Sequence, residues 1–187
     1  MKRYLKMIGL GVGLGIGFLI IQYVFKIEDS KMMNYYIVFG VIIIAIATVY
    51  SVIQMKKDMK LLQKFSDGIS NRAVDGNLLS EVEEFENKKK SQPKVLNLVY
   101  INRSVYYGSL KKYDKALEEL DKVEYKLLSR QNKLIYLNNK IEYLMEIEED
   151  DLAKEVYKKN KSYIEQNIHL ISSISGINFG KFEKMFE

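Results

Sequence analysis

Apolar and polar residues divide this chain into two very different parts. Two long apolar runs, Met7–Phe25 and Tyr35–Ile53, contain no Asp, Glu, Lys or Arg. At 1.5 Å of rise per residue, each run forms a helix of about 28 Å, which is enough to cross the hydrocarbon core of a bilayer. From Lys56 onward, charged residues recur throughout the chain. The sequence therefore predicts a two-helix transmembrane hairpin over residues 1–55, followed by a tail that is soluble in water.

The tail carries apolar residues at helical spacing, separated by short polar turns. Pro93, the only proline in the chain, is the clearest break in this pattern. No segment alternates apolar and polar residues as a half-buried strand would. One stripe with helical spacing consists of Tyr113, Ala116, Leu117, Leu120, Val123 and Leu127. The pattern predicts an all-α chain, with a membrane-proximal helical hairpin and linker over 56–93 and a helical domain over 94–187.

Two stretches of the tail are similar to each other, Lys112–Leu120 and Glu149–Tyr157. Each places a small residue, Ala116 or Ala153, where two helices of a hairpin would cross, and these alanines are 153 − 116 = 37 residues apart. With its Tyr-x-x-Ala-Leu sequence, the first stretch resembles the second helix of the tetratricopeptide repeat family. The positions that would pack by this resemblance are Tyr100, Ser104, Tyr107, Tyr113, Ala116, Leu120 and Val123, then Leu137, Ile141, Leu144, Ala153 and Tyr157.

The chain departs from the family pattern in three ways. The family repeat is about 34 residues long. Ser104 stands where the family has a glycine, and the terminal proline of the repeat is missing. The resemblance covers roughly residue 62 to the C-terminus, with its best matches over Lys94–Asn160.

The resemblance implies a cytoplasmic α-solenoid of antiparallel helix hairpins that binds a protein or peptide partner on its concave side. Asparagines there would hydrogen-bond the backbone or the terminus of an extended peptide, and ordinary surface polarity is the alternative. The partner-binding residues implied by the repeat mapping are Leu98, Ile101, Asn102, Val105, Ser109, Ile135, Asn138, Asn139 and Glu142. The function expected from this mapping is a membrane-anchored interaction module that recruits or scaffolds a partner.

Alternating glycines in the first apolar run suggest close helix packing. Gly9, Gly13 and Gly17 share one face of a helix, and Gly11 and Gly15 lie about 200° away on another. One face is expected to pack against the second span. The other either contacts lipid or meets another copy or a different membrane protein. The last case makes the chain a possible homo-oligomer, or a structural or accessory subunit of a membrane complex.

The distribution of basic residues predicts the orientation of the hairpin. The connection Lys26–Asn34 carries charges of both signs, whereas both outer flanks are basic. By the positive-inside rule, both termini face the cytoplasm and the protein is a multi-pass protein of the cell membrane. The basic flanking residues are Lys2, Arg3 and Lys6 before the first span and Lys56, Lys57, Lys60 and Lys64 after the second. Because part of the net charge of +5 flanks the spans, nucleic acid is not an expected partner.

The residues that usually carry out catalysis or bind metal are scarce. The chain has no cysteine, and His169 is its only histidine. The acidic run Glu146–Asp151 lacks the spacing and the glycine of an EF-hand. We therefore expect no catalytic site, no cofactor and no metal site, and the chain is not expected to be an enzyme.

The C-terminus presents an apolar edge formed by Phe179, Phe182, Met185 and Phe186. A repeat array usually ends in a helix with a polar outer face. This edge is therefore expected to fold back onto the preceding helices, the alternative being that it docks onto another molecule.

Overall fold

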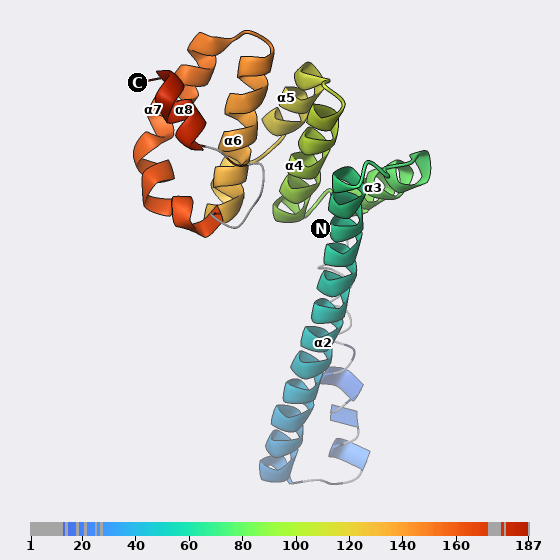
Figure 1. Ribbon diagram of the computed structural model, residues 1–187. Coiled ribbons are helices and arrows are strands. Elements are labelled where there is room, and N and C mark those ends of the chain that lie inside the picture. Colours follow the sequence, from blue (N-terminus) through green and yellow to red (C-terminus); the bar gives the residue numbers. More distant parts are fainter. Residues whose placement is uncertain are drawn as a thin grey trace. The chain divides into compact units, whose positions relative to one another are not determined.

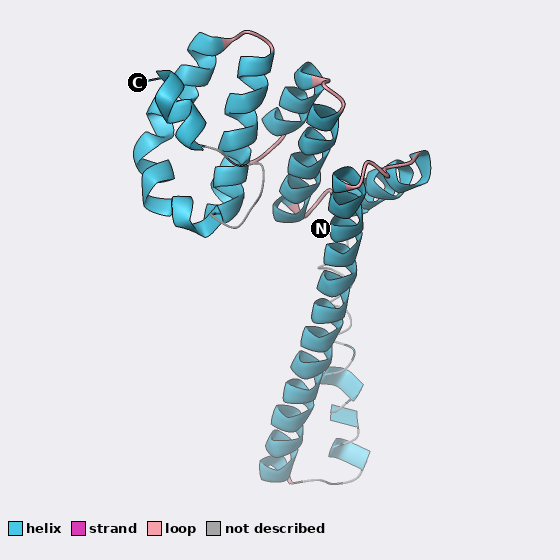
Figure 2. Cartoon of the chain, in the orientation of Figure 1, coloured by secondary structure: helices cyan, strands magenta, loops and turns pink. Residues whose placement is uncertain are grey.

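The computed structural model describes residues 13, 15–17, 19, 20, 22–24, 26, 28–171, 177 and 179–186. Within these residues the regular secondary structure is helical, without any strand (Figure 2). The prediction of an all-α protein is therefore confirmed for this part of the chain. The chain divides into two compact units, Met1–Lys57 and Asp58–Glu187.

The first unit is dominated by an apolar helical surface. Helix α2 (Asp29–Ser70) starts in this unit, and its stretch Met33–Ser70 is long and apolar enough to cross a membrane. None of its most apolar window is buried within the protein, and Ile44 is 67% exposed. Such an uncovered apolar surface is unusual in a soluble protein and common where lipid surrounds a helix. A shorter apolar helix spans Gly15–Val24, so the described residues contain one helix of membrane-spanning length.

The sequence pattern predicts a new amphipathic helix after Met55, but α2 continues without a break to Ser70. No glycine or proline interrupts the chain between Ile53 and Asp67, so nothing in that stretch terminates the helix.

Shorter helices follow α2 in the second unit, and side chains cap two of them, α3 and α6 (Figure 1). The side chain of Asp75 accepts a hydrogen bond from the Leu78 N–H at 2.8 Å, and Ser129 caps α6 in the same way. Pro93 occupies the first turn of α4, where its missing N–H costs nothing. The helices are α3 (Gly76–Lys89), α4 (Pro93–Ser109), α5 (Tyr113–Asp121), α6 (Arg130–Glu146), α7 (Asp150–Asn167) and α8 (Phe179–Phe186), with short 3-10 turns at Tyr125–Leu127 and Ile168–Ile171.

Helix α5 is shorter than its apolar stripe predicts. The stripe runs on to Leu127, but the helix ends at Asp121. The buried side chain of Asn97 donates to the Glu124 carbonyl at 3.0 Å and accepts from the Glu124 N–H at 2.9 Å. The second bond takes the Glu124 N–H, which another helical turn would use, while the Glu124 carbonyl also accepts from the Leu127 N–H at 2.9 Å.

Two helix hairpins, α4–α5 and α6–α7, turn in the same way 37 residues apart. Lys111 and Glu148 both have left-handed backbone angles, with φ of 56° and 64°. In the first turn the Lys112 N–H donates to the Tyr107 carbonyl, and in the second the Glu149 N–H donates to the Leu144 carbonyl, both at 2.9 Å. Main-chain bonds of this kind satisfy carbonyls left open at a helix C-terminus.

The two small residues predicted at the hairpin crossings are both buried. Ala116 and Ala153 have no exposed surface. Leu120 and Tyr157, from the same predicted packing positions, are also buried, while Tyr107 and Val123 are half-buried. The internal similarity in the sequence therefore corresponds to two hairpins with matching turns and matching closely packed alanines.

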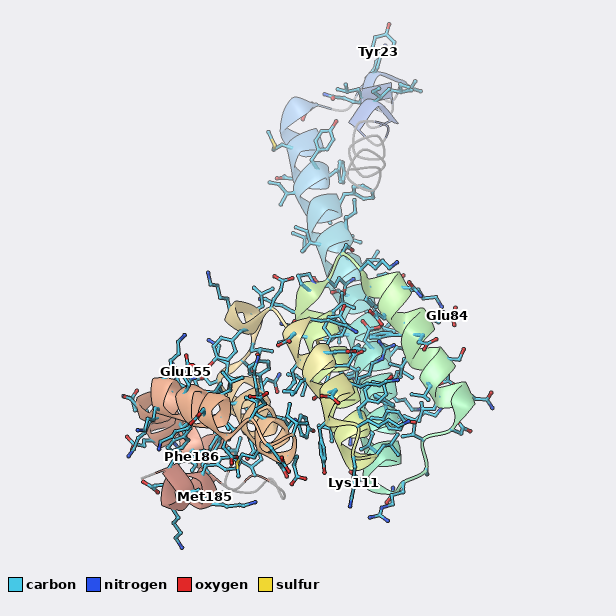
Figure 3. All side chains as sticks on the ribbon, turned by 90° about the horizontal axis from the view of Figure 1, so that it is seen from above. Tyr23, Glu84, Lys111, Glu155, Met185 and Phe186 are labelled. Atoms are coloured by element: carbon cyan, nitrogen blue, oxygen red, sulfur yellow. The ribbon has the colours of Figure 1, made fainter. Side chains whose placement is uncertain are left out.

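The turn at Lys111, which lies at the end of the α4–α5 hairpin, allows a direct test (Figure 3). A left-handed conformation is unfavourable for lysine and free for glycine. Lys111→Gly is therefore expected to raise the free energy of unfolding by roughly 0.5–1 kcal/mol. The neighbouring Lys112, with φ of −97°, has no such strain, so Lys112→Gly should give no increase. Denaturant unfolding of the full chain in detergent, followed by circular dichroism, measures both changes.

Three apolar clusters stabilise the second unit. The first joins the end of α2 to α3 and α4, and Phe65 and Val82 are fully buried in it. The second includes Ile101, Leu120 and Tyr143 and lies where α4, α5 and α6 meet. The third connects α6, α7 and the C-terminal segment. Each hairpin thus shares apolar contacts with its neighbours along the chain.

The C-terminal edge folds back, as predicted. Phe179, Phe182 and Phe186 are buried in the cluster of α6 and α7, and the Phe186 ring lies 5.8 Å from the Tyr157 ring. Met185, on the other side of α8, is 53% exposed. Three of the four predicted edge residues therefore form part of the core of this unit.

Candidate functional site

A groove of about 670 Å³ lies in the second unit. Three helices supply one stripe each, with residues three or four positions apart as a single helix face requires. The stripes are Met59, Leu62, Gln63, Ser66, Ile69 and Ser70 on α2, then Leu98, Ile101, Asn102, Val105, Gly108 and Ser109 on α4, and Asn132, Ile135, Asn139, Glu142 and Tyr143 on α6. Tyr113 at the start of α5 and Ile177 complete the lining.

The structure brings the predicted partner-binding residues together in this groove, with one exception. Leu98, Ile101, Asn102, Val105, Ser109, Ile135, Asn139 and Glu142 all line it. Asn138 is 2% exposed and is not among the residues that line the groove. Its amide donates a long hydrogen bond of 3.5 Å to the side-chain carbonyl of Asn139.

Sequence reasoning missed the contribution of α2. Leu62 and Ile69 follow helical spacing in the sequence, but nothing in that pattern indicates that this helix faces the same space as α4 and α6. Tyr143 was also missed, since an aromatic residue in a helix is most simply interpreted as core. The sequence contains one signal of a shared groove: the stripes around Asn102 and Asn139 have the same polar composition.

Asn139 carries an unpaired polar group in the groove wall. Asn139 is 7% exposed, and its amide nitrogen has no hydrogen-bond acceptor in the described part of the chain. Asn97, which is 1% exposed, shows the usual arrangement, because its amide donates and its carbonyl accepts. A buried donor without an acceptor is destabilising, and native structures contain few of them. An acceptor supplied by a bound molecule would remove this cost.

Tyr143 shapes the floor of the groove against α4. A Cβ atom at Gly108 would lie 2.6 Å from the Tyr143 hydroxyl oxygen and ring edge, so only glycine permits this approach. Burial raises the pKa of the Tyr143 phenol well above its ordinary value, and the nearby Glu142 carboxylate adds to the increase. Tyr143 is therefore a neutral hydroxyl at physiological pH.

Glu142 is the one Asp, Glu, Lys or Arg among the described residues that line the groove. Desolvation raises the pKa of its carboxyl group, and the Glu146 carboxylate raises it further. Lys181 on α8 and the Asn138 side chain act in the opposite direction. The groove thus has an acidic character and contains no cation of its own in the described lining.

A raised pKa makes the charged form of Glu142 less favourable in the folded protein than in the unfolded chain. This cost is present above the folded-state pKa and disappears as the pH falls below the unfolded-state pKa. At pH 7, Glu142→Gln should therefore melt at the same temperature as the natural protein or at a higher one. This difference in melting temperature should disappear at about pH 4. Thermal melts at both pH values test this. Glu155→Gln, at an exposed position on α7 (Figure 3), serves as the control and should melt like the natural protein at pH 7.

The glycines of the first apolar run belong to the first unit. A Cβ atom at Gly13, Gly15 or Gly17 would meet no other atom within 4 Å. The described glycines are therefore not in close contact with another helix in this structure. Gly9 and Gly11, the other two of the predicted packing set, lie outside the described residues.

The described residues contain no group of three or more His, Asp or Glu side chains placed to hold a metal ion. His169 is exposed in the 3-10 turn Ile168–Ile171. Within the acidic run, Glu148 forms the left-handed turn, and Asp150 and Asp151 occupy the first turn of α7. Carboxylates at a helix N-terminus interact favourably with the helix dipole, which accounts for their position.

Comparison with known proteins finds no matching family model, no matching curated protein and no matching solved structure. The interpretation of the groove therefore depends on its residues alone.

Proposed function

We propose that this protein is a membrane-anchored interaction module whose helical tail holds a segment of a partner protein in the groove between α2, α4 and α6. One observation carries the proposal. The groove gathers residues from three helices and includes a buried amide donor, on Asn139, that has no acceptor among the residues the structure describes. Binding sites are typically concave and apolar with a few directed polar groups, and this groove has that composition.

In this proposal the two hairpins belong to a tetratricopeptide-like array. Support comes from the matching left-handed turns at Lys111 and Glu148 and from the fully buried Ala116 and Ala153. The groove residues on α4 and α6 then occupy the first-helix positions that related repeats use for binding.

In the same proposal the anchor is a two-span hairpin with both termini in the cytoplasm. The uncovered apolar face of Met33–Ser70 supports one span, and the first apolar run would supply the other. Alkaline carbonate should leave the protein in the membrane fraction. Protease added outside intact cells should leave the tail uncut, and release by carbonate or cleavage of the tail would contradict the anchor or its orientation.

Site-specific photocrosslinking in native membranes tests the binding function. A photoreactive amino acid at Asn102 or Ser109 lies in the groove, whereas one at the exposed Glu118 or Lys158 lies on other surfaces of the same unit. We expect the two groove positions to crosslink to the same protein and the two control positions not to. Equal crosslinking at all four positions, or none in the groove, would contradict the proposal.

A second candidate function is a structural or accessory subunit of a membrane complex, assembled through the glycines of the first apolar run. The open space around Gly13, Gly15 and Gly17 favours it, because a second helix could approach the backbone there. Gly13→Leu together with Gly15→Leu separates the two candidates. Loss of assembly in detergent supports the subunit function, and intact crosslinking from the groove supports the interaction module.

A further inference from the structure

Among the described residues that line the groove, Glu142 is the one charged side chain. Glu142 is acidic, and the other described lining residues are apolar, hydroxyl-bearing or amide side chains. Lys181 acts on the Glu142 carboxylate from α8, but it does not line the groove. A bound carboxylate would therefore be desolvated next to the Glu142 carboxylate, which repels it, while a bound cation would find a carboxylate ready to accept hydrogen bonds.

The buried amide of Asn139 sets a second requirement for the ligand. Asn139 and Glu142 are three residues apart on α6, so their side chains lie on the same helix face. A ligand that reaches Glu142 therefore passes the unpaired Asn139 donor, which needs an acceptor such as a backbone carbonyl. Backbone carbonyls occur at regular intervals along an extended peptide, so a peptide can satisfy the donor whatever its side chains are.

The apolar residues of the groove indicate what flanks these polar contacts. Leu98, Ile101 and Val105 form a row along α4, and Ile135 faces them from α6. Such a surface stabilises a ligand by removing apolar side chains from water. In an extended segment, alternate side chains point to the same side, which matches an apolar wall next to a polar one.

We propose that the groove binds an extended internal segment of a partner protein that presents a Lys or Arg side chain to Glu142, a backbone carbonyl to the Asn139 amide and apolar side chains to α4. This inference rests on the proposed binding function. It adds that the groove selects basic segments over acidic ones. The same charge pattern excludes a C-terminal carboxylate as the group that is recognised.

The pH dependence of binding follows from the same contacts. The groups facing Glu142 are Glu146 on its own helix, Lys181 on α8, Tyr113 on α5 and the adjacent Tyr143. A bound cation would lower the pKa of the Glu142 carboxyl, so binding releases a proton when that carboxyl starts out protonated. The affinity for a basic peptide is therefore full above the pKa of free Glu142 and falls as the pH drops through it.

Selection from a peptide library tests the charge preference. The full chain in detergent micelles is immobilised, and a display library of randomised ten-residue segments, flanked on both sides so that no terminus is free, is passed over it. We expect Lys and Arg to be enriched and Asp and Glu to be depleted among the bound segments. The best basic segment, made as a synthetic peptide with blocked ends, should bind Glu142→Gln about tenfold more weakly. Its affinity for the control Glu155→Gln should not change.

Two further variants separate the charge from the hydrogen bond. Glu142→Lys should reverse the preference toward acidic segments. Asn139→Leu, a change of similar volume, should weaken the binding of basic and of neutral segments by the same factor. Circular dichroism shows whether this variant is folded. Glu142 is exposed, so its variants keep the fold even if Asn139→Leu does not.

The outcomes distinguish this inference from the function on which it rests. Enrichment of acidic segments or of segments without charge bias overturns the inference and leaves a peptide-binding groove. If no segment is enriched and photocrosslinks from Ser109 reach only lipid or a second copy of the chain, both the inference and the proposed function are wrong.

Discussion

Replacing Phe182 by alanine is expected to lower the free energy of unfolding of the second unit by about 3–5 kcal/mol. The Phe182 side chain is 3% exposed and is packed between the rings of Phe179 and Phe186, at centroid distances of 6.0 and 6.5 Å. Removing it leaves a cavity next to α7 that the short helix α8 cannot close without losing its other contacts. Denaturant unfolding of the full chain in detergent measures the change.

Met185 on the same helix provides the control. Its side chain is 53% exposed, so Met185→Ala should change the free energy of unfolding by less than about 0.5 kcal/mol. If both variants unfold like the natural protein, α8 does not pack on α7 in solution and the apolar C-terminal edge is free for another molecule.

Replacing Gly108 by alanine should cost about 1–3 kcal/mol and also change the groove. The added Cβ atom would overlap the Tyr143 ring, which is 6% exposed and lies 5.9 Å from the Tyr113 ring. Either α4 shifts away from α6 or the ring swings into the groove. We therefore expect a lower melting temperature together with weaker crosslinking from Ser109.

Gly76 is the matched control for this change. It is the first residue of α3, and a Cβ atom there meets no other atom within 4 Å. Gly76→Ala should raise the free energy of unfolding by up to about 1 kcal/mol, since alanine loses less backbone entropy on folding than glycine. Equal destabilisation by both alanines would mean that Tyr143 does not rest against Gly108.

Helix type and most helix starts could be predicted from the sequence because they depend on local chemistry. Pro93 and the helical spacing of Leu78, Val82 and Phe85 each act within one or two turns. The end of α5 could not be predicted in this way. It depends on Asn97, which binds the backbone of Glu124 from 27 residues away, and a sequence pattern does not reveal which distant side chain will reach a given turn.

The same distinction explains what was found and missed at the groove. Residues on α4 and α6 followed from one repeat mapping, because equivalent positions of two hairpins face the same way. Asn138 differs from Asn139 by a single position, or about 100° around the helix, and a mapping accurate to one residue cannot separate them. The α2 wall has no counterpart in the repeat, so only the packing of Leu62 and Phe65 against α3 and α4 places it.

The bends at Lys111 and Glu148 are closed by main-chain atoms, and neither position holds the glycine that such a bend favours. Their shape therefore depends little on which side chains occupy them. If one hairpin arose by duplication of the other, nearly every residue of the two copies could diverge while the backbone bend persisted. A comparison of dihedral angles along the backbone would then reveal common ancestry even where the residue identities had diverged too far to align.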